Sequence, residues 1–277
     1  LAPAMNQKMY SSIALKDNLS VLHNRNMNVI SPDYGDQACG DVGEGRLPEP
    51  VNIATKVSEL FKNTRLTGKK VLITIGATIE EIDPVRFLSN RSSGKMGMAL
   101  ANTCIEYGAD VTIVYGNIST QLNDRCNNIS VTSAEQMYKA VMKNIDHQDV
   151  FISCAAVCDY KIKDVSKDKI KRGGSNMFLE LVPNKDILFD VCKLNSKPVT
   201  IGFSAETQNL TKNAKNKLIN KGCDAIILND VSRADIGFNS DDNEVVFLTI
   251  NQSIKIEKNS KQKVGKKIIE ILCNKLI

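Results

Sequence analysis

The chain has 277 residues, of which 42% are hydrophobic and 24% are charged, and its formal net charge is +5. This composition is ordinary for a globular protein and excludes disordered and collagen-like chains. Lysines are spread along the sequence, Trp is absent and only 5% of residues are aromatic, so we expect no nucleic-acid partner. We find no run of about 18 apolar residues and no signal-peptide pattern, so we expect no membrane span.

Residues 1–66 contain few predicted elements. Apolar spacing indicates a helix near residues 11–25, a short strand at 28–30 and a helix at 51–61, with the Gly-rich sequence ACGDVGEGR at 38–46 between them. A segment of about 66 residues buries only a small core. Residues 63–68 are typical of a linker.

From residue 69 onward, short apolar runs alternate with helical periodicity. The predicted strands are 70–75, 110–114, 150–154, 177–182, 200–203 and 225–228, the predicted helices are 92–107, 134–144, 186–194, 210–221 and 261–274, and a hairpin is predicted at 244–250 and 253–257. Alternating strands and helices predict an α/β fold. We expect a Rossmann-like open, mostly parallel sheet with helices on both faces and a C-terminal antiparallel hairpin.

Eight cysteines and two histidines limit the metal and redox chemistry. No C-x-x-C pair is present, and His23 and His147 are far apart in the sequence. Several cysteines lie inside apolar runs, which is typical of free buried thiols in a reducing compartment. We therefore expect no structural zinc site and a cytoplasmic protein.

The first segment whose residues could form a functional site is ITIGATIEEIDPVRFLSNRSSGKMG, residues 73–97. A strand ends at Gly76 and a helix is expected to begin near Ser92 and Ser93, either of which can cap it. Helix N-termini favour anions, and Gly94 allows close backbone approach. Neither the Walker order nor GxGxxG is present. A capped helix without a ligand is the alternative interpretation.

The second and third segments carry charges at predicted strand ends. Asp159 follows the strand at 150–154 and could hold a metal that is bound to phosphates. Lys169 could reach an anionic substrate, although a solvated loop explains it equally. Lys217 and Lys221 share one helical face and could meet an anion or be a plain surface pair. Phe203 is either core or a platform for a base.

A fourth segment is the polar loop at 229–244, which could be a lid, an interface arm or a plain loop. Together, the four segments resemble the phosphopantothenate–cysteine ligases of bacterial coenzyme A synthesis. DPVRFLSNRSSGKMG, AAVCDY, GFSAET, NDVS and IGFNSDDNEV carry the resemblance, over about residues 69–275. It implies ligation of 4'-phosphopantothenate with L-cysteine. CTP is the co-substrate, an acyl-cytidylate the intermediate and Mg²⁺ the metal. It also implies a homodimer, formed through the late hairpin.

The resemblance also implies roles for individual residues. Asn90 and Lys169 are the catalytic positions, Asp159 is the metal contact, and Arg86 and Ser93 join Asn90 in substrate binding. The implied nucleotide-binding positions are Asp159, Lys169, Lys185, Asp186, Ile187, Leu188, Phe203, Lys217 and Lys221. The chain departs from the family pattern at Ile75, Ala77, Ile79, Lys185 and Cys158.

PAMN at 3–6 and ACGDVGEGR at 38–46 resemble the flavin-dependent phosphopantothenoylcysteine decarboxylase that bacteria fuse in front of this ligase. The resemblance implies a decarboxylase remnant at 1–66 and a ligase domain at 67–277. It makes Asn6 a substrate-binding residue and Cys39 a proton donor. The first residue is Leu1, and the flavin-binding start and catalytic histidine are missing. We expect a truncated bifunctional protein without decarboxylase activity, with FMN bound only by the full-length domain.

Two other functions are weighed. A Rossmann-type nucleotide-binding oxidoreductase is disfavoured by the missing GxGxxG and by lysines grouped for a polyphosphate. A non-catalytic regulatory subunit with the same fold is the second alternative, because the loop after Gly76 is altered.

Overall fold

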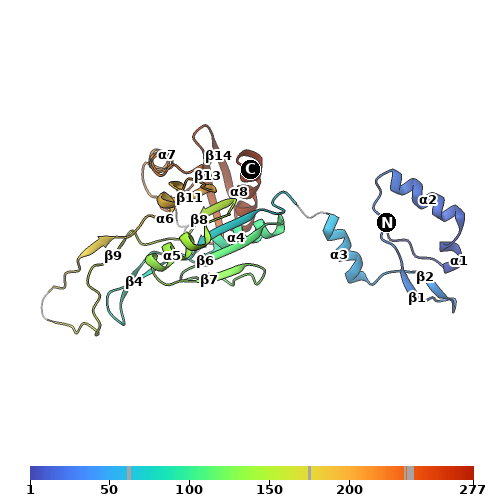
Figure 1. Ribbon diagram of the computed structural model, residues 1–277, viewed down its shortest axis with the longest axis horizontal. Coiled ribbons are helices and arrows are strands. Elements are labelled where there is room, and N and C mark those ends of the chain that lie inside the picture. The colour runs from blue at the N-terminus through green and yellow to red at the C-terminus, as the bar shows by residue number, and fades with distance from the viewer. Residues whose placement is uncertain (61–63, 174–175, 234, 236–239) are drawn as a thin grey trace. The chain divides into compact units, whose positions relative to one another are not determined.

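The computed structural model describes residues 1–60, 64–173, 176–233, 235 and 240–277 (Figure 1). The chain divides into two compact units, Leu1–Lys62 and Asn63–Ile277. The expected helix end at Phe61, the first linker residue Asn63 and the part of the polar loop at 236–239 lie outside the described residues. Among the helices that are described, none has the length and apolarity that crossing a membrane requires.

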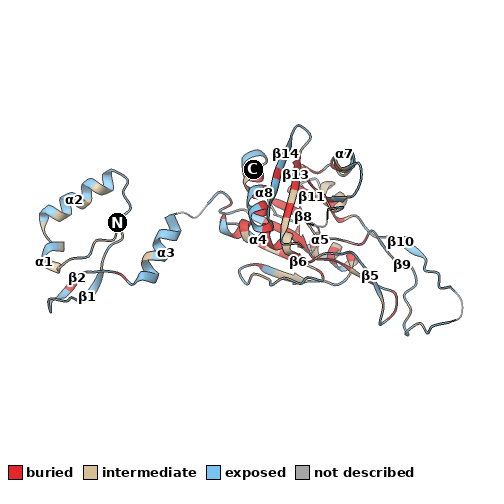
Figure 2. Cartoon of the chain, turned by 180° about the vertical axis from the view of Figure 1, so that it is seen from behind, coloured by how far each residue is buried: buried red, intermediate tan, exposed pale blue. Residues whose placement is uncertain are grey.

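The first unit contains short elements around little buried apolar surface. They are α1 (Gln7–Tyr10), α2 (Ile13–Asn24), β1 (Asp33–Asp36), β2 (Val42–Arg46) and α3 (Pro50–Leu60). None of the three helices contains a buried residue, and they are pale blue with some tan in Figure 2. The predicted strand at 28–30 is wrong, because these residues join no strand ladder. The N-terminal amine of Leu1 donates to the Asn28 carbonyl oxygen, and the Ile30 N–H donates to the Leu1 carbonyl oxygen. The strands instead flank and include the Gly-rich stretch, where β1 pairs with β2.

The second unit is built on an eight-stranded sheet with the order β14-β13-β12-β11-β8-β3-β6-β7. The strands are β3 (Lys70–Ile75), β6 (Asp110–Tyr115), β7 (Asn127–Ser130), β8 (Val150–Ser153), β11 (Val199–Glu206), β12 (Ala225–Asp230), β13 (Asp242–Leu248) and β14 (Ser253–Ser260). All neighbours from β12 to β7 are parallel, whereas β13 is antiparallel to both of its neighbours. The predicted α/β class and the antiparallel edge hairpin are confirmed.

Helices cover both faces of this sheet. They are α4 (Lys95–Glu106) and α8 (Lys261–Lys275) on one face, and α5 (Ala134–Asn144), α6 (Ile187–Cys192) and α7 (Leu210–Lys221) on the other. The side chains of β3 alternate between the two apolar clusters, with Val71 and Ile73 in one and Leu72 in the other. A strand buried on both faces must be apolar throughout, which explains the continuous run KVLITI. The buried residues therefore concentrate in the central strands (Figure 2).

Two small ribbons extend this core, and the sequence did not predict them. They are β4 (Ile79–Glu81) paired with β5 (Phe87–Ser89), and β9 (Tyr160–Ile162) paired with β10 (Leu181–Pro183). The predicted strand at 177–182 is wrong, because only its last two residues enter β10, which lies outside the main sheet. β9 and the segment that follows it reach away from the sheet (Figure 1).

The topology fixes where a ligand can bind. After β3 the chain continues to β6 on one side and later returns to β8 on the other side of β3. Such a reversal opens a crevice at the carboxyl ends of the parallel strands. Asp242 at the start of β13 pairs with Ser260 at the end of β14, so the hairpin delivers residues to the same sheet edge.

Candidate functional site

A cavity of about 480 Å³ lies at this edge, a size typical of small-molecule sites. Its lining comes from the loops after β3, β5 and β8, from the second half of β11, the end of β12, the first turn of α4, α7 and the hairpin region: Gly76, Asn90, Arg91, Ser92, Ser93, Gly94, Lys95, Met96, Gly97, Cys154, Ala155, Ala156, Val157, Asp159, Phe203, Ser204, Ala205, Lys217, Asn229, Val231, Asn243 and Lys261. A second compartment of about 170 Å³ shares Ala155, Val157, Asp159, Phe203 and Lys217 with it. The two compartments therefore adjoin along these five residues.

The first turn of α4 forms one wall of the large cavity. The helix begins at Lys95, later than predicted, and the expected cap by Ser92 or Ser93 is wrong. Gly94 is the N-cap, with φ of 77°, and no side chain caps it. A Cβ at Gly97 would lie 2.1 Å from Ile75 Cγ2, so the helix backbone packs directly against β3. This N-terminus can bind an anion through its amides and its dipole.

Asn90 lies between two of the loops that line the cavity. Its Nδ2 donates a hydrogen bond of 2.9 Å to the carbonyl oxygen of Val157, in the loop after β8. The backbone N–H of Cys158 donates to Thr78 Oγ1 at 2.9 Å, which joins the same loop to the one after β3. These bonds hold Asn90 at the mouth of the cavity, where its side-chain oxygen can meet a substrate.

A carboxylate and two lysines meet where the compartments adjoin. Lys217 Nζ donates a hydrogen bond of 2.7 Å to the carbonyl oxygen of Phe203. Burial lowers the pKa of Lys217 and of Lys221, and the negative charge of Asp159 opposes both shifts. Within the described residues, the Asp159 carboxylate has no hydrogen bond or ion pair. The arrangement can therefore bind an anion and a cation side by side.

The smaller compartment contains the predicted base-binding residues. Asp186 caps α6 by accepting a 3.0 Å hydrogen bond from the Phe189 amide, and it forms an ion pair with Lys221. Ile187 and Leu188 are buried and line the compartment. Lys185 also lines it, but its ammonium lies 4.5 Å from the Tyr138 ring centroid and 3.6 Å from Glu135 on α5.

Arg86 and Lys169 do not line either compartment. Arg86 Nη2 lies 2.5 Å from the Asp83 carboxylate and donates to the carbonyl oxygen of Ile170 at 2.5 Å. Asp83 also accepts a 3.1 Å bond from the Ile170 amide. Burial alone would raise the pKa of Asp83, but the hydrogen bonds from Arg86, Val85 and Ile170 hold it well below its ordinary value. Arg86 and Asp83 thus fix the segment that carries the exposed Lys169.

The first unit brings its two predicted residues together. Asn6 Nδ2 lies 3.0 Å from Cys39 Sγ and donates a 2.9 Å hydrogen bond to Asp41. Both Asn6 and Cys39 line a shallow cavity of about 390 Å³ with Arg46. The Gly-rich stretch therefore folds back onto the PAMN segment.

Sequence reasoning missed four cavity residues: Arg91, Lys95, Asn243 and Lys261. It noted Asn229 only as part of a polar loop. The two late residues could have been found from topology, because an antiparallel hairpin after β12 returns to the carboxyl edge where β13 starts and β14 ends.

The residues present fit a magnesium ion that is held mainly by phosphates. Mg²⁺ is commonly bound by one or two carboxylates together with substrate phosphate oxygens. Asp159 supplies the carboxylate, and the buried Oδ1 of Asn229 has no hydrogen-bond partner in the described part of the chain. No cluster of three His, Cys, Asp or Glu side chains occurs among the described residues, so a cage made by the protein alone is not indicated there.

Comparisons with known proteins match both units of the chain to known families. Residues 66–276 match the DNA/pantothenate metabolism flavoprotein C-terminal domain, and residues 1–62 match the flavoprotein family. The coenzyme A biosynthesis bifunctional protein CoaBC of Vibrio parahaemolyticus is 42% identical over 273 residues, which cover 98% of this chain and 68% of that protein.

Two solved structures are similar to much of this chain. A CoaBC C-terminal domain has a TM-score of 0.66 at 34% identity, over 77% of this chain and 98% of that one. A Cab2 variant in complex with phosphopantothenate-cysteine has a TM-score of 0.61 over 82% of this chain and 95% of that one; at 15% identity it shows the fold alone. The chain belongs to the CoaBC family of bifunctional coenzyme A biosynthesis proteins.

Proposed function

We propose that the chain ligates 4'-phosphopantothenate to L-cysteine with consumption of CTP. The supporting observation is the meeting of Asp159 with Lys217 and Lys221 at the carboxyl edge of the sheet, next to the N-terminus of α4. A carboxylate, two lysines and a helix N-terminus suit a nucleoside triphosphate better than a neutral ligand. The adjoining compartment lined by Ile187 and Leu188 is the proposed place for the base.

In the first half of the proposed reaction, the carboxylate of phosphopantothenate attacks the α-phosphorus of CTP. The bond from that phosphorus to the bridging oxygen breaks, and pyrophosphate leaves with the electron pair. Lys217 and Lys221 neutralise the negative charge that the two anionic reactants bring together. Mg²⁺, where bound at Asp159, would supply further charge neutralisation on the phosphate oxygens. Lys169 is proposed to contact the reacting phosphate.

In the second half, the amine of cysteine attacks the activated carbonyl carbon and CMP leaves. Asn90 is proposed to bind the acyl-cytidylate through its amide, which the Val157 carbonyl already orients. Holding the amine and the acyl group together provides most of the acceleration, since no protein nucleophile is needed. Ser93, which is buried in the cavity wall, is proposed as a substrate contact.

The decisive assay incubates the chain with phosphopantothenate, CTP, Mg²⁺ and cysteine and detects the thiol product by mass. Asn90→Asp should still form the cytidylate but use it poorly, whereas Lys169→Gln should abolish its formation. Lys167→Gln is the matched control, because Lys167 is exposed in the same segment and has no ion pair there. Wild-type pyrophosphate release by the Lys169 variant would refute its assignment.

The same assay separates the other candidates. Replacing CTP with ATP determines the nucleotide. A tight NADPH complex without CTP binding would favour an oxidoreductase. Pyrophosphate release that requires CTP and phosphopantothenate together excludes a purely regulatory subunit. Residues 1–62 match a flavoprotein family, and we propose FMN only for a chain that carries a whole decarboxylase domain.

We further propose a homodimer. Exposed large apolar side chains gather on the two small ribbons and in the segment before β10, including Phe87, Tyr160, Phe178 and Leu181. On the described late hairpin, only Ile250 is of this kind, so the ribbons are favoured over the hairpin as the interface. Phe178→Ser should weaken the dimer in light scattering at low micromolar concentration, and Ile250→Ser should not. The opposite pattern would favour the late hairpin.

A further inference from the structure

The last helix contributes a buried ammonium group to the large cavity. Lys261 is the first residue of α8, is 7% exposed and lines the cavity beside Lys95 and Asn243. Burial lowers the pKa of Lys261, and the positive charge of Lys95 lowers it further. A buried cation is unfavourable unless acceptors or an anion compensate for its lost hydration. The negative charge of Asp241 opposes this lowering of the pKa, and Lys261 also lines the cavity.

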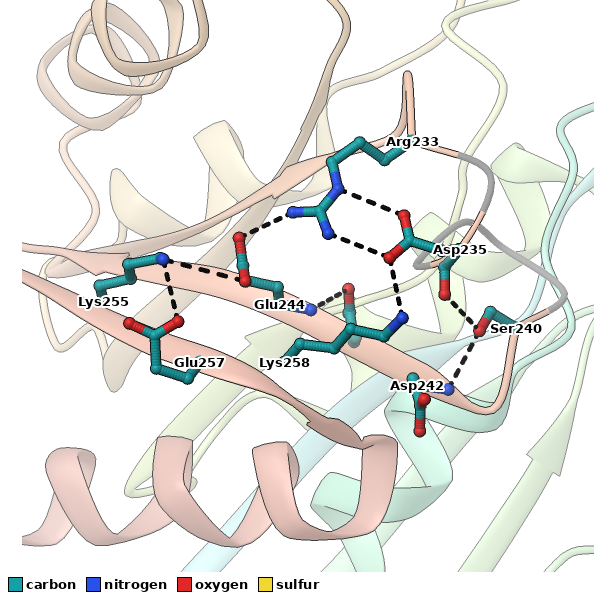
Figure 3. A network of polar contacts seen from close by, with 9 residues as sticks. Arg233, Asp235, Ser240, Asp242, Glu244, Lys255, Glu257 and Lys258 are labelled. Atoms are coloured by element: carbon teal, nitrogen blue, oxygen red, sulfur yellow. Dashed lines mark hydrogen bonds and ion pairs between the residues drawn. The ribbon is translucent and has the colours of Figure 1, made fainter.

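Lys261 is held in one position from two sides. Its backbone N–H donates to the carbonyl oxygen of Asp241 at 2.8 Å, and its Nζ donates to the carbonyl oxygen of Ser240 at 2.5 Å. Ser240 is fixed in turn, since its Oγ donates to the carbonyl oxygen of Asp235 and accepts from the Asp242 amide (Figure 3). The ammonium therefore enters the cavity wall from a pre-organised turn.

A network of ion pairs supports this turn from the outer side. Arg233 contacts both carboxylate oxygens of Asp235, at 3.2 and 3.0 Å, and its Nη1 lies 2.9 Å from Glu244 on β13 (Figure 3). Lys258 on β14 joins Asp235 at 2.8 Å. Single exposed pairs contribute little, but this network links the loop before β13 to both hairpin strands. The network therefore fixes the position of Ser240 and Asp241, which lie between the loop and β13.

Asn243 adds a neutral donor beside Lys261. It is 2% exposed, and its Oδ1 accepts from the Glu244 amide at 2.9 Å. Its Nδ2 lies 3.8 Å from the sulfur of Met96, in the first turn of α4. A thioether is a weak acceptor, so a phosphate oxygen would be a better partner for this amide. The hairpin region and the start of α4 thus converge on one wall of the cavity.

We propose that Lys261 is a phosphate-binding residue that holds the pyrophosphate leaving group, with Asn243 beside it. The proposal rests on the proposed function and adds a second cationic wall to the one formed by Lys217. In the activation step, the bridging oxygen keeps the electron pair of the broken bond, and Lys261 donates a hydrogen bond to the released diphosphate without transferring a proton.

The test compares Lys261→Met with Lys266→Met in the full chain. Lys266 lies on the same helix but is exposed and outside the cavity, so its variant is the matched control. Calorimetric titration with inorganic pyrophosphate and Mg²⁺ should show a loss of affinity of about 10- to 100-fold for Lys261→Met. KM for CTP should rise by a similar factor while KM for phosphopantothenate is unchanged. Lys261→Arg, which keeps the charge, should recover binding, and this rescue distinguishes phosphate binding from a folding defect.

The outcomes separate this proposal from the proposed function. If product forms but Lys261→Met binds pyrophosphate and CTP like wild type, the role of Lys261 is refuted and the ligase activity stands. If no product forms but pyrophosphate binding still depends on Lys261, the ligase assignment fails and the phosphate-binding residue stands. If wild type binds neither pyrophosphate nor CTP, both are overturned.

Discussion

The contact between α4 and β3 yields a quantitative prediction for Gly97→Ala. The added methyl group would lie 2.1 Å from Ile75 Cγ2 and 2.8 Å from Ile75 Cβ, and Ile75 is fully buried. Overpacking of this kind costs about 1–3 kcal/mol. Replacing a helical glycine returns up to about 1 kcal/mol. The cost less this return is a net loss of about 0–3 kcal/mol; at the middle of this range, about 1.5 kcal/mol, Tm should fall by roughly 3–6 °C in a unit of this size.

Thermal unfolding followed by circular dichroism measures this change. Gly173→Ala is the matched control, because a Cβ at Gly173 has no neighbour within 4 Å. Its Tm should stay near the wild-type value. Relief of the Ile75 overlap must shift the first turn of α4, so Gly97→Ala should also raise KM for CTP. An unchanged Tm together with an unchanged KM would show that the helix start is not fixed by Ile75.

Three further predictions concern charge and thiol chemistry. Asp83→Asn should lower kcat by freeing the segment beside Lys169 and should also lower Tm, because the hydrogen bonds that lower the pKa of Asp83 stabilise the fold, while KM for phosphopantothenate stays little changed; wild-type kcat would contradict this positioning role. Hydrogen bonds from Lys258 and Arg233 lower the pKa of Asp235 from 3.8 to about 2. The contribution of ionised Asp235 to the stability of the fold is therefore complete above about pH 4 and is lost as pH falls through 2. The difference in Tm between wild type and Asp235→Asn should accordingly vanish at the acid end. Cys39 is exposed, whereas burial raises the pKa of Cys154 to about 12, so a thiol reagent at neutral pH should modify Cys39 first; early labelling of Cys154, detected by mass spectrometry, would contradict this.

Seven strands of the main sheet could be predicted because they are encoded locally, whereas the edge strand β7 (Asn127–Ser130) was missed. KVLITI is a continuous apolar run because both faces of β3 are covered. Such a run can be recognised in the sequence without knowing which strands pair with it. The three-residue strands β4, β5, β9 and β10 could not be predicted, because each depends on its partner strand. β4 pairs with β5 across a turn, and β9 pairs with β10, which is remote in the sequence. The start of α4 was misplaced because a glycine in the left-handed region, rather than a serine, ends the preceding loop.

For the candidate site, motifs predicted the residues that surround the crevice but not the directions of long side chains. Lys185 lines the smaller compartment, as its predicted role at a base requires, but its ammonium lies over the ring of Tyr138 from another helix, and that role stays a prediction. Arg86 was expected at the substrate, yet it is held by Asp83. Such outcomes depend on tertiary neighbours that no local pattern encodes. Lys261 was missed for the same reason, because its place follows from strand order alone.

The return of the hairpin to the carboxyl edge also sets when the cavity is completed during synthesis. The loops after β3 and β8 leave the ribosome early, but the wall formed by Asn243 and Lys261 is made only after residue 261 has been added. α8 must also dock before that wall is stable, because Val264, Ile268 and Leu272 are fully buried against α4 and the sheet. A nascent chain that stops within the hairpin would therefore lack this wall of the cavity.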